Sequence, residues 1–229
     1  MPTSELPDRD LRRAMILRFG AAVPVLAAVF FIPAGTLAYW EAWVYMAVLL
    51  VPGLLAIQNL RKTAPELLVR RMQMREREMA QRRLVAASSL VFLLIFILPG
   101  LDHRFGWSSV PPLVVLAADA LVVLGFALVW RVFRENQYAS RVVQVESGQR
   151  VISTGPYASV RHPMYTGVAL MILATPVALG SYWALLPALT IVPILMVRIR
   201  NEELVLDRDL IGYTEYRRRV KYRLVPGVW

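Results

Sequence analysis

Six apolar blocks recur along the chain and leave few folds open to it. They occupy residues 18–38, 41–60, 84–101, 113–133, 164–179 and 183–199. The first four approach the roughly 20 residues that a helix needs to cross a bilayer, whereas each of the last two extends over only about 25 Å as a helix. The chain is 57% hydrophobic with a mean hydropathy of +0.51, above the roughly 45–50% apolar content of soluble domains. We therefore expect an all-α integral membrane protein of about six transmembrane helices.

The distribution of basic residues predicts the orientation of these helices. Of the 26 Lys and Arg residues, all but Arg104 lie within residues 1–18, 61–83, 131–161 or 198–229, which are the N-terminal segment, two alternate loops and the tail with the adjoining ends of the blocks. With six spans this pattern places both termini in the cytosol, because basic loops stay on the cytoplasmic side. Aromatic residues that favour a membrane interface gather at the opposite boundary: Tyr39, Trp40, Trp43, Trp107, Tyr182 and Trp183.

The spans divide the chain into three parts. Residues 1–17 form a cytosolic N-terminal segment, which mixes acidic and basic residues and shows no clear cleavage site. Residues 18–133 hold four transmembrane helices with a basic cytosolic loop at 61–83. Residues 134–229 hold a polar segment, a helical hairpin and a basic tail. Function is expected in this last part, because its polar residues exceed what orientation in a membrane requires.

Composition removes several classes of site. The chain has no Cys and two His, which excludes disulfides, thiolate ligands and multi-histidine metal centres. The net charge of +10 is explained by bases beside the spans, where they orient helices and contact anionic lipids, so no nucleic-acid partner is expected. Asp119 is the one carboxylate deep within a predicted span; it lies near the outer boundary, and we expect a structural role for it.

Two polar segments flank the last two blocks and converge on the cytosolic face. The first runs from residue 153 to 167 and the second from 201 to 223. Their aromatic rings, carboxylates and arginines suit a polar cofactor with a flat base, a ribose and a zwitterionic tail. Taken alone, the residues leave a functional site and an ordinary solvated helix end equally open. The residues of this cluster are Tyr157, Arg161, His162, Tyr165, Glu202, Glu203, Tyr213 and Tyr216.

The same segments resemble a known family. The run from Gly155 to Gly167 (Gly-Pro-Tyr-Ala-Ser-Val-Arg-His-Pro-Met-Tyr-Thr-Gly), the pair Glu202-Glu203 and the tail around Tyr216 are similar to the isoprenylcysteine carboxyl methyltransferases. This superfamily includes phospholipid N-methyltransferases. The resemblance extends over about the last 95 residues, from 135 to 229, and is to bacterial members, which implies a bacterial inner-membrane protein with its active site facing the cytoplasm.

The resemblance implies S-adenosylmethionine as cofactor and assigns roles to individual residues. Two residues, Arg161 and Arg219, correspond to the substrate-side arginines. Cofactor contacts are implied for His162, Tyr165, Glu202 and Glu203, and the same motifs add Gly155, Tyr157 and Tyr213.

The class of methyl acceptor is inferred from the charged residues of the predicted site. A carboxylate is already nucleophilic and needs an arginine to hold its two oxygens, whereas an amine must first lose a proton to a base. The surplus of arginine favours a carboxylate of a lipidic, isoprenylcysteine-like acceptor that arrives from the bilayer. The alternatives are a phospholipid N-methyltransferase, an NADPH-dependent membrane reductase, for which no G-x-G-x-x-G loop is present, and a non-catalytic membrane protein.

Overall fold

The described part of the chain is mainly α-helical, and no strand occurs among these residues. The structure is a computed structural model that describes residues 8–63, 79–136, 138, 145 and 148–229. Most of the predicted basic loop at 61–83 and the first seven residues lie outside these ranges. Within them the α-helices are α1 (Asp8–Ala34), α2 (Trp40–Thr63), α4 (Met79–Phe105), α5 (Pro112–Glu135), α6 (Pro163–Ala178), α7 (Leu185–Leu189), α8 (Ile191–Asp209) and α9 (Tyr213–Arg219). A short 3₁₀ helix, η1, covers Gly155–Ala158.

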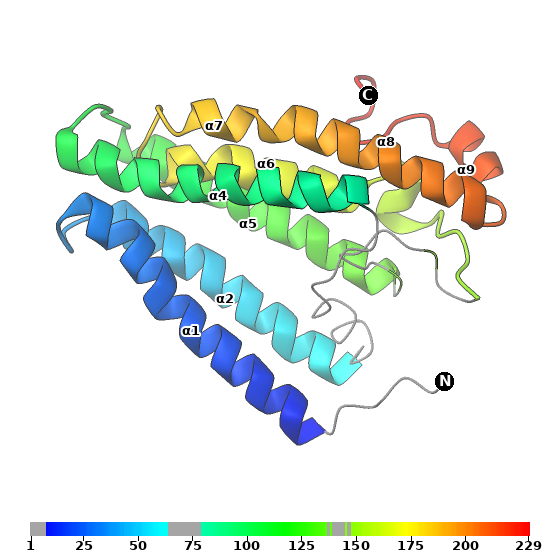
Figure 1. The fold of residues 1–229 in the computed structure, drawn as a ribbon, viewed down its shortest axis with the longest axis horizontal. Helices are drawn as coiled ribbons and strands as arrows, with labels where there is room; N and C mark the ends of the chain where they lie inside the picture. Colours follow the sequence, from blue (N-terminus) through cyan, green and yellow to red (C-terminus); the bar gives the residue numbers. More distant parts are fainter. Residues whose placement is uncertain (1–7, 64–78, 137, 139–144, 146–147) are drawn as a thin grey trace.

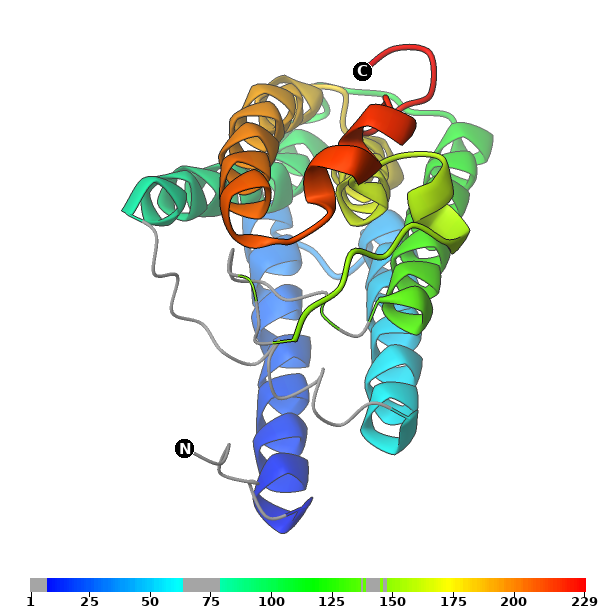
Figure 2. The same ribbon diagram turned by 90° about the vertical axis from the view of Figure 1, so that its right-hand side faces the viewer.

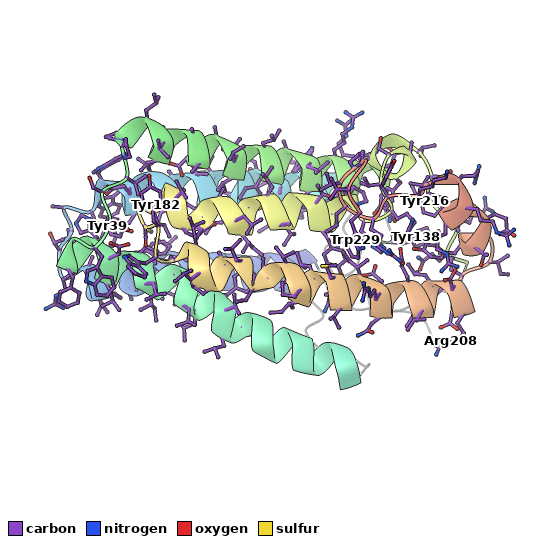
Figure 3. All side chains as sticks on the ribbon, turned by 90° about the horizontal axis from the view of Figure 1, so that it is seen from above. Tyr39, Tyr138, Tyr182, Arg208, Tyr216 and Trp229 are labelled. Atoms are coloured by element: carbon purple, nitrogen blue, oxygen red, sulfur yellow. The ribbon has the colours of Figure 1, made fainter. Side chains whose placement is uncertain are left out.

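Six long passes run back and forth in one bundle, with α7 and α8 together forming the last (Figure 1). The turns at residues 35–39, 106–111 and 179–184 lie at one end, which we name the hairpin end. The end of α2, the segment at 148–162 and the C-terminal tail lie at the other, which we name the basic end. Figure 3 places Tyr39 and Tyr182 at the hairpin end and Tyr216 and Trp229 at the basic end.

Two of the described helices, α2 and α5, are long and apolar enough to cross a membrane by length and composition. Large apolar side chains on them face outward: Leu113 is 79% exposed and Leu55 is 57% exposed. Such exposure on a helix with so few charges is what a hydrocarbon environment stabilises and water does not. The all-α expectation is confirmed for the described residues, while the six spans and the cytosolic termini stay predictions.

The last predicted span differs from the observed helices. The sequence predicts one helix over 183–199, but α7 ends at Leu189, and α8 then continues to Asp209. The interruption between α7 and α8 lies at Thr190, whose hydroxyl donates to the carbonyl of Pro187 at 2.7 Å. The extension of α8 past the apolar block places Glu202 and Glu203 on a rigid helix rather than in a loop.

Glycines bring the backbones of α5 and α6 into close contact. A Cβ on Gly125 would lie 2.8 Å from the carbonyl oxygen of Gly167, and a Cβ on Gly167 would lie 2.9 Å from that of Gly125. Small residues that face each other in this way let membrane helices pack backbone to backbone. Since α6 begins immediately after His162, this contact fixes where the polar motif sits.

Asp119 lies on α5, within the core shared by α1, α2, α5 and α6. It is 4% exposed, and neither carboxylate oxygen has a hydrogen-bond partner among the described residues. Its position near the hairpin end keeps it away from the polar cluster, and the neighbouring buried hydroxyls of Tyr45 and Thr175 bond to each other at 2.7 Å.

Candidate functional site

The start of α6 is bound to the C-terminal tail by backbone hydrogen bonds. The N–H of Arg161 donates to the carbonyl of Tyr222, and the N–H of His162 donates to that of Arg223, both at 2.9 Å. Pro163 follows as the first residue of α6, where the absent N–H leaves no helical bond unmade. Figure 2 shows the tail and α9 lying across the beginning of α6 at the basic end. Segments about 60 residues apart therefore form one local unit.

Glu203 of α8 is the charge around which this unit is assembled. Its Oε1 accepts from Nε of Arg161 at 2.7 Å and lies 3.3 Å from Nε2 of His162. Its Oε2 accepts from Nε of Arg223 at 2.8 Å. Burial by itself raises the pKa of Glu203, but the hydrogen bonds from His162 and Arg161, with the charge of the imidazole, outweigh it and lower the pKa to about 2. Glu203 is thus an anion that ties α8, α6 and the tail together.

Most hydrogen-bond donors of Arg161 bind groups within this unit. Besides its bond to Glu203, its Nη1 donates to the carbonyls of Val220 and Lys221, both at 2.8 Å. The side chain is 3% exposed. Three of the five N–H donors of a guanidinium are therefore directed at the protein, which differs from the substrate clamp that the sequence predicts.

Glu202, which precedes Glu203 in the sequence, contacts different residues. Its Oε2 accepts from the hydroxyl of Tyr165 at 2.7 Å, and that hydroxyl accepts from Nε of Arg198 at 2.8 Å. The Nδ1 atom of His162 lies 4.0 Å from Oε1 of Glu202. The carboxylate of Glu202 is thus oriented by Tyr165, beside the imidazole of His162.

Three tyrosines form the aromatic wall of the site. The hydroxyl of Tyr216 donates to the carbonyl of Tyr157 at 2.8 Å, and Nδ2 of Asn136 donates to the hydroxyl of Tyr157 at 2.8 Å. Burial raises the pKa of Tyr157 to about 12, because the bond from Asn136 lowers it by less and the charge of Glu202 raises it further. The Tyr213 hydroxyl is buried without a hydrogen-bond partner among the described residues. An unpaired buried hydroxyl is unfavourable, so this group has capacity for a ligand.

A cavity of about 110 Å³ lies among these groups. It is smaller than the roughly 300–1,000 Å³ of most ligand sites, so a ligand of nucleoside size requires its walls to separate. Its lining comes from the end of α5, the segment before η1, η1 itself, the link from η1 to α6, and helices α6, α8 and α9. The lining residues are Asn136, Tyr138, Gln149, Arg150, Val151, Ile152, Tyr157, Arg161, His162, Met164, Tyr165, Glu202, Leu206, Leu210, Tyr213 and Tyr216.

The structure brings most of the predicted site residues together. Glu203 lies directly behind the cavity lining, in contact with Arg161 and His162. The predicted residues that line the cavity are Tyr157, Arg161, His162, Tyr165, Glu202 and Tyr213.

Gly155 and Arg219 do not line the cavity. Gly155 has φ +57°, and a Cβ there would lie 2.9 Å from Cδ of Glu135. This glycine makes the turn into η1. Arg219 is exposed in the last turn of α9, so the predicted pair of arginines does not meet at the cavity.

Sequence reasoning missed Asn136, Arg150, Arg198 and Arg223. Arg198 carried a signal, because it lies four residues before Glu202 and shares its helix face. Arg223 carried none, since its contact with Glu203 depends on how the tail folds back. In the part of the chain that the structure describes, no group of three or more His, Asp or Glu residues is placed to hold a metal ion.

One comparison with known proteins bears on this geometry. Residues 113–210 match the family model of the phospholipid methyltransferases. That family is related to the isoprenylcysteine carboxyl methyltransferases, so the match confirms the superfamily resemblance and extends it upstream to α5. It stops before Tyr213 and Arg219, the two predicted site residues in the tail.

Proposed function

We propose that this protein is an S-adenosylmethionine-dependent methyltransferase that acts on a lipid at the membrane surface. The observation that carries the proposal is the cavity at the basic end, where Glu202, oriented by Tyr165, faces His162 and the buried hydroxyl of Tyr213. Of these groups, His162, Tyr165 and Glu202 lie within the residues that match the phospholipid methyltransferase family.

The residues around the cavity fit the proposed cofactor chemically. When bound, S-adenosylmethionine supplies a methyl group on a positively charged sulfonium. The carboxylate of Glu202 is an acceptor for the cationic part of such a molecule, and the unpartnered hydroxyl of Tyr213 is available to a sugar hydroxyl. Tyr157 supplies an aromatic surface for a base. Methyl transfer is a displacement that depends mainly on positioning the reactants, so these residues need only bind and orient.

Two acceptors remain, and the charges in the cavity favour one. A carboxyl O-methyltransferase would hold its acceptor with Arg161 and Arg219, but the first is bound to Glu203 and the second lies outside the lining. An aminophospholipid needs a group that takes a proton, and His162 lines the cavity beside the Glu202 carboxylate that is assigned to the cofactor. We therefore place an aminophospholipid first. A lipid carboxylate is second, supported by Arg150, which also lines the cavity.

We place the cavity on the cytoplasmic side of a bacterial inner membrane. The basic tail and the cavity share one end of the bundle, and basic segments stay in the cytoplasm. Single cysteines at the exposed Ser109 and at Thr214 test this in the Cys-free chain. An impermeant thiol reagent added to intact cells should label Ser109→Cys and reach Thr214→Cys only after lysis; the reverse pattern would invert the topology.

The function is tested with purified protein in nanodiscs. S-adenosylhomocysteine should raise the melting temperature, because a ligand that binds the folded state stabilises it, and Glu202→Gln should reduce this rise. Glu215→Gln, an exposed change on α9, is the matched control and should not. Labelled methyl groups should then appear in phosphatidylethanolamine or in N-acetyl-S-farnesylcysteine, which distinguishes the two acceptors. Stabilisation by NADPH in place of S-adenosylhomocysteine would refute the proposal.

A further inference from the structure

A second, apolar hollow lies away from the polar cavity, between α2 and α5. It encloses about 520 Å³, within the range of ligand sites for lipids and drug-sized molecules. Among the residues that the structure describes, no charged side chain lines it. Its walls are Pro52, Leu55 and Ala56 of α2, and Val123, Phe126, Ala127, Val129, Trp130 and Phe133 of α5.

The groove arises from the way the two helices diverge. Near the hairpin end their side chains share one core, in which Tyr45 and Met46 of α2 pack with Ala118 and Val122 of α5. Toward the basic end α2 and α5 separate, as Figure 1 shows. Both helices are candidate membrane spans by length and composition, so under the predicted six-span arrangement the opening between them faces hydrocarbon.

The length of the groove matches one leaflet of a bilayer. On α5 its lining runs from Val123 to Phe133, which at 1.5 Å per residue is about 15 Å. Half of a hydrocarbon core of about 30 Å has the same depth. A chain in this groove would extend from the membrane surface at the basic end to the bilayer centre.

The groove ends beside the polar cavity. Phe133, its last residue on α5, precedes Asn136 by about one helical turn. Asn136 lines the polar cavity and donates to the Tyr157 hydroxyl at 2.8 Å. A hydrocarbon chain in the groove therefore brings the polar group attached to it to the wall formed by Asn136 and Tyr157.

We propose that the groove between α2 and α5 binds one acyl chain of the phospholipid acceptor and so positions the headgroup at the polar cavity. This rests on the proposed function. Because the acyl chain leaves the hydrocarbon of the bilayer for an apolar groove, the hydrophobic effect contributes little to its binding. Recognition therefore depends on close packing of the acyl chain against the groove walls. The groove should therefore set KM and chain-length preference, while the polar cavity binds the cofactor independently.

The first test needs no turnover. A phosphatidylethanolamine with a diazirine in its acyl chain is irradiated with the protein in nanodiscs, and the labelled peptides are mapped by mass spectrometry. Label should concentrate on the groove faces of α2 and α5, and unlabelled dioleoyl phosphatidylethanolamine should compete for it. Uniform label over all lipid-facing helices, or cross-links between α2 and α5 of two copies of the chain, would overturn the proposal. Preferential labelling by a farnesyl diazirine would also overturn it, because the chain bound would then be a prenyl chain.

The second test fills the groove. Ala127→Trp on α5 and Ala56→Trp on α2 place a bulky ring in it from opposite walls. The matched controls are Ala117→Trp and Ala47→Trp, which are exposed positions on the same two helices outside the groove. Groove variants should lose about tenfold or more in kcat/KM with dioleoyl phosphatidylethanolamine, mainly through KM, and retain the rate with the dihexanoyl lipid.

The two tests separate failure of this proposal from failure of the proposed function. Binding of S-adenosylhomocysteine should be equal in groove variants and controls. Equal loss of activity in both would show that the groove has no specific role, even if the wild type transfers methyl groups. Absence of methyl transfer in the wild type would refute the function, and localised cross-linking would still establish the lipid site.

Discussion

Glu203 offers the sharpest test of how the site is assembled, because Glu203→Gln keeps its shape and removes its charge. Two arginines and a histidine then face an amide in a site where the side chain is 5% exposed. The fall of its pKa from 4.5 to about 2 corresponds to about 3 kcal/mol at neutral pH. Breaking a buried ion pair by removing one partner gives a similar figure, about 3–5 kcal/mol. For a chain of this size we expect the melting temperature to fall by roughly 6–12 °C.

The pH dependence separates charge from packing. Because the folded pKa of Glu203 lies below its ordinary value, its contribution to stability is complete above about pH 4.5 and is lost as pH falls toward 2. The wild type should therefore approach Glu203→Gln in stability over this window. Unfolding is followed in nanodiscs by the heat-induced change in intrinsic fluorescence, with Glu215→Gln as the exposed control. A gap between wild type and Glu203→Gln that stays constant from pH 6 to pH 3 would refute the electrostatic account.

Three further substitutions test other parts of the fold by melting temperature and turnover. Arg223→Ala should destabilise the protein, since it removes a 2.8 Å hydrogen bond to Glu203 and a guanidinium that lies 5.0 Å from the Trp229 ring. The control Arg219→Ala should match the wild type in melting temperature and in turnover. Loss of turnover in Arg219→Ala alone would support the predicted role of Arg219 as a substrate clamp. Gly167→Ala should force α5 and α6 apart and destabilise the protein by about 1–3 kcal/mol. The control Gly20→Ala places no atom within 4 Å of the new Cβ and should be neutral or stabilising. Equal changes in melting temperature for the two variants would contradict the close contact between α5 and α6. Asp119→Leu should raise the melting temperature, because it removes a buried carboxylate without a described partner; a large drop would show that this group is required.

Features of the fold and site that depend on residues close together in the sequence were predictable, and features that depend on distant segments were not. Helices α2 and α5 were predictable from apolar runs, which are local. His162, Tyr165 and Glu202 were predictable as a cluster, because a hairpin returns the chain to the same face. The contacts of Arg161 and the exposed position of Arg219 were not predictable, since they depend on the path of the tail: its carbonyls at Val220 and Lys221 accept from Arg161. No spacing in the sequence encodes that path.

The tail also shows how the site is held in position. The hydroxyl of Thr166, in the first turn of α6, donates to the carbonyl of Leu224 at 2.8 Å. The N–H of Leu224 in turn donates to the carbonyl of Trp229 at 2.9 Å. These neutral bonds run parallel to the ion pairs of Glu203, so the tail stays bound to α6 even when one charge is removed. We therefore expect residues 149–152, before η1, to be the part of the cavity wall that opens for a cofactor, because the ion pairs of Glu203 join α6 to α8 and backbone hydrogen bonds join the start of α6 to the tail. Hydrogen exchange should accordingly be faster at Val151 and Ile152 than at Arg161 and His162, whose N–H groups bond to the tail.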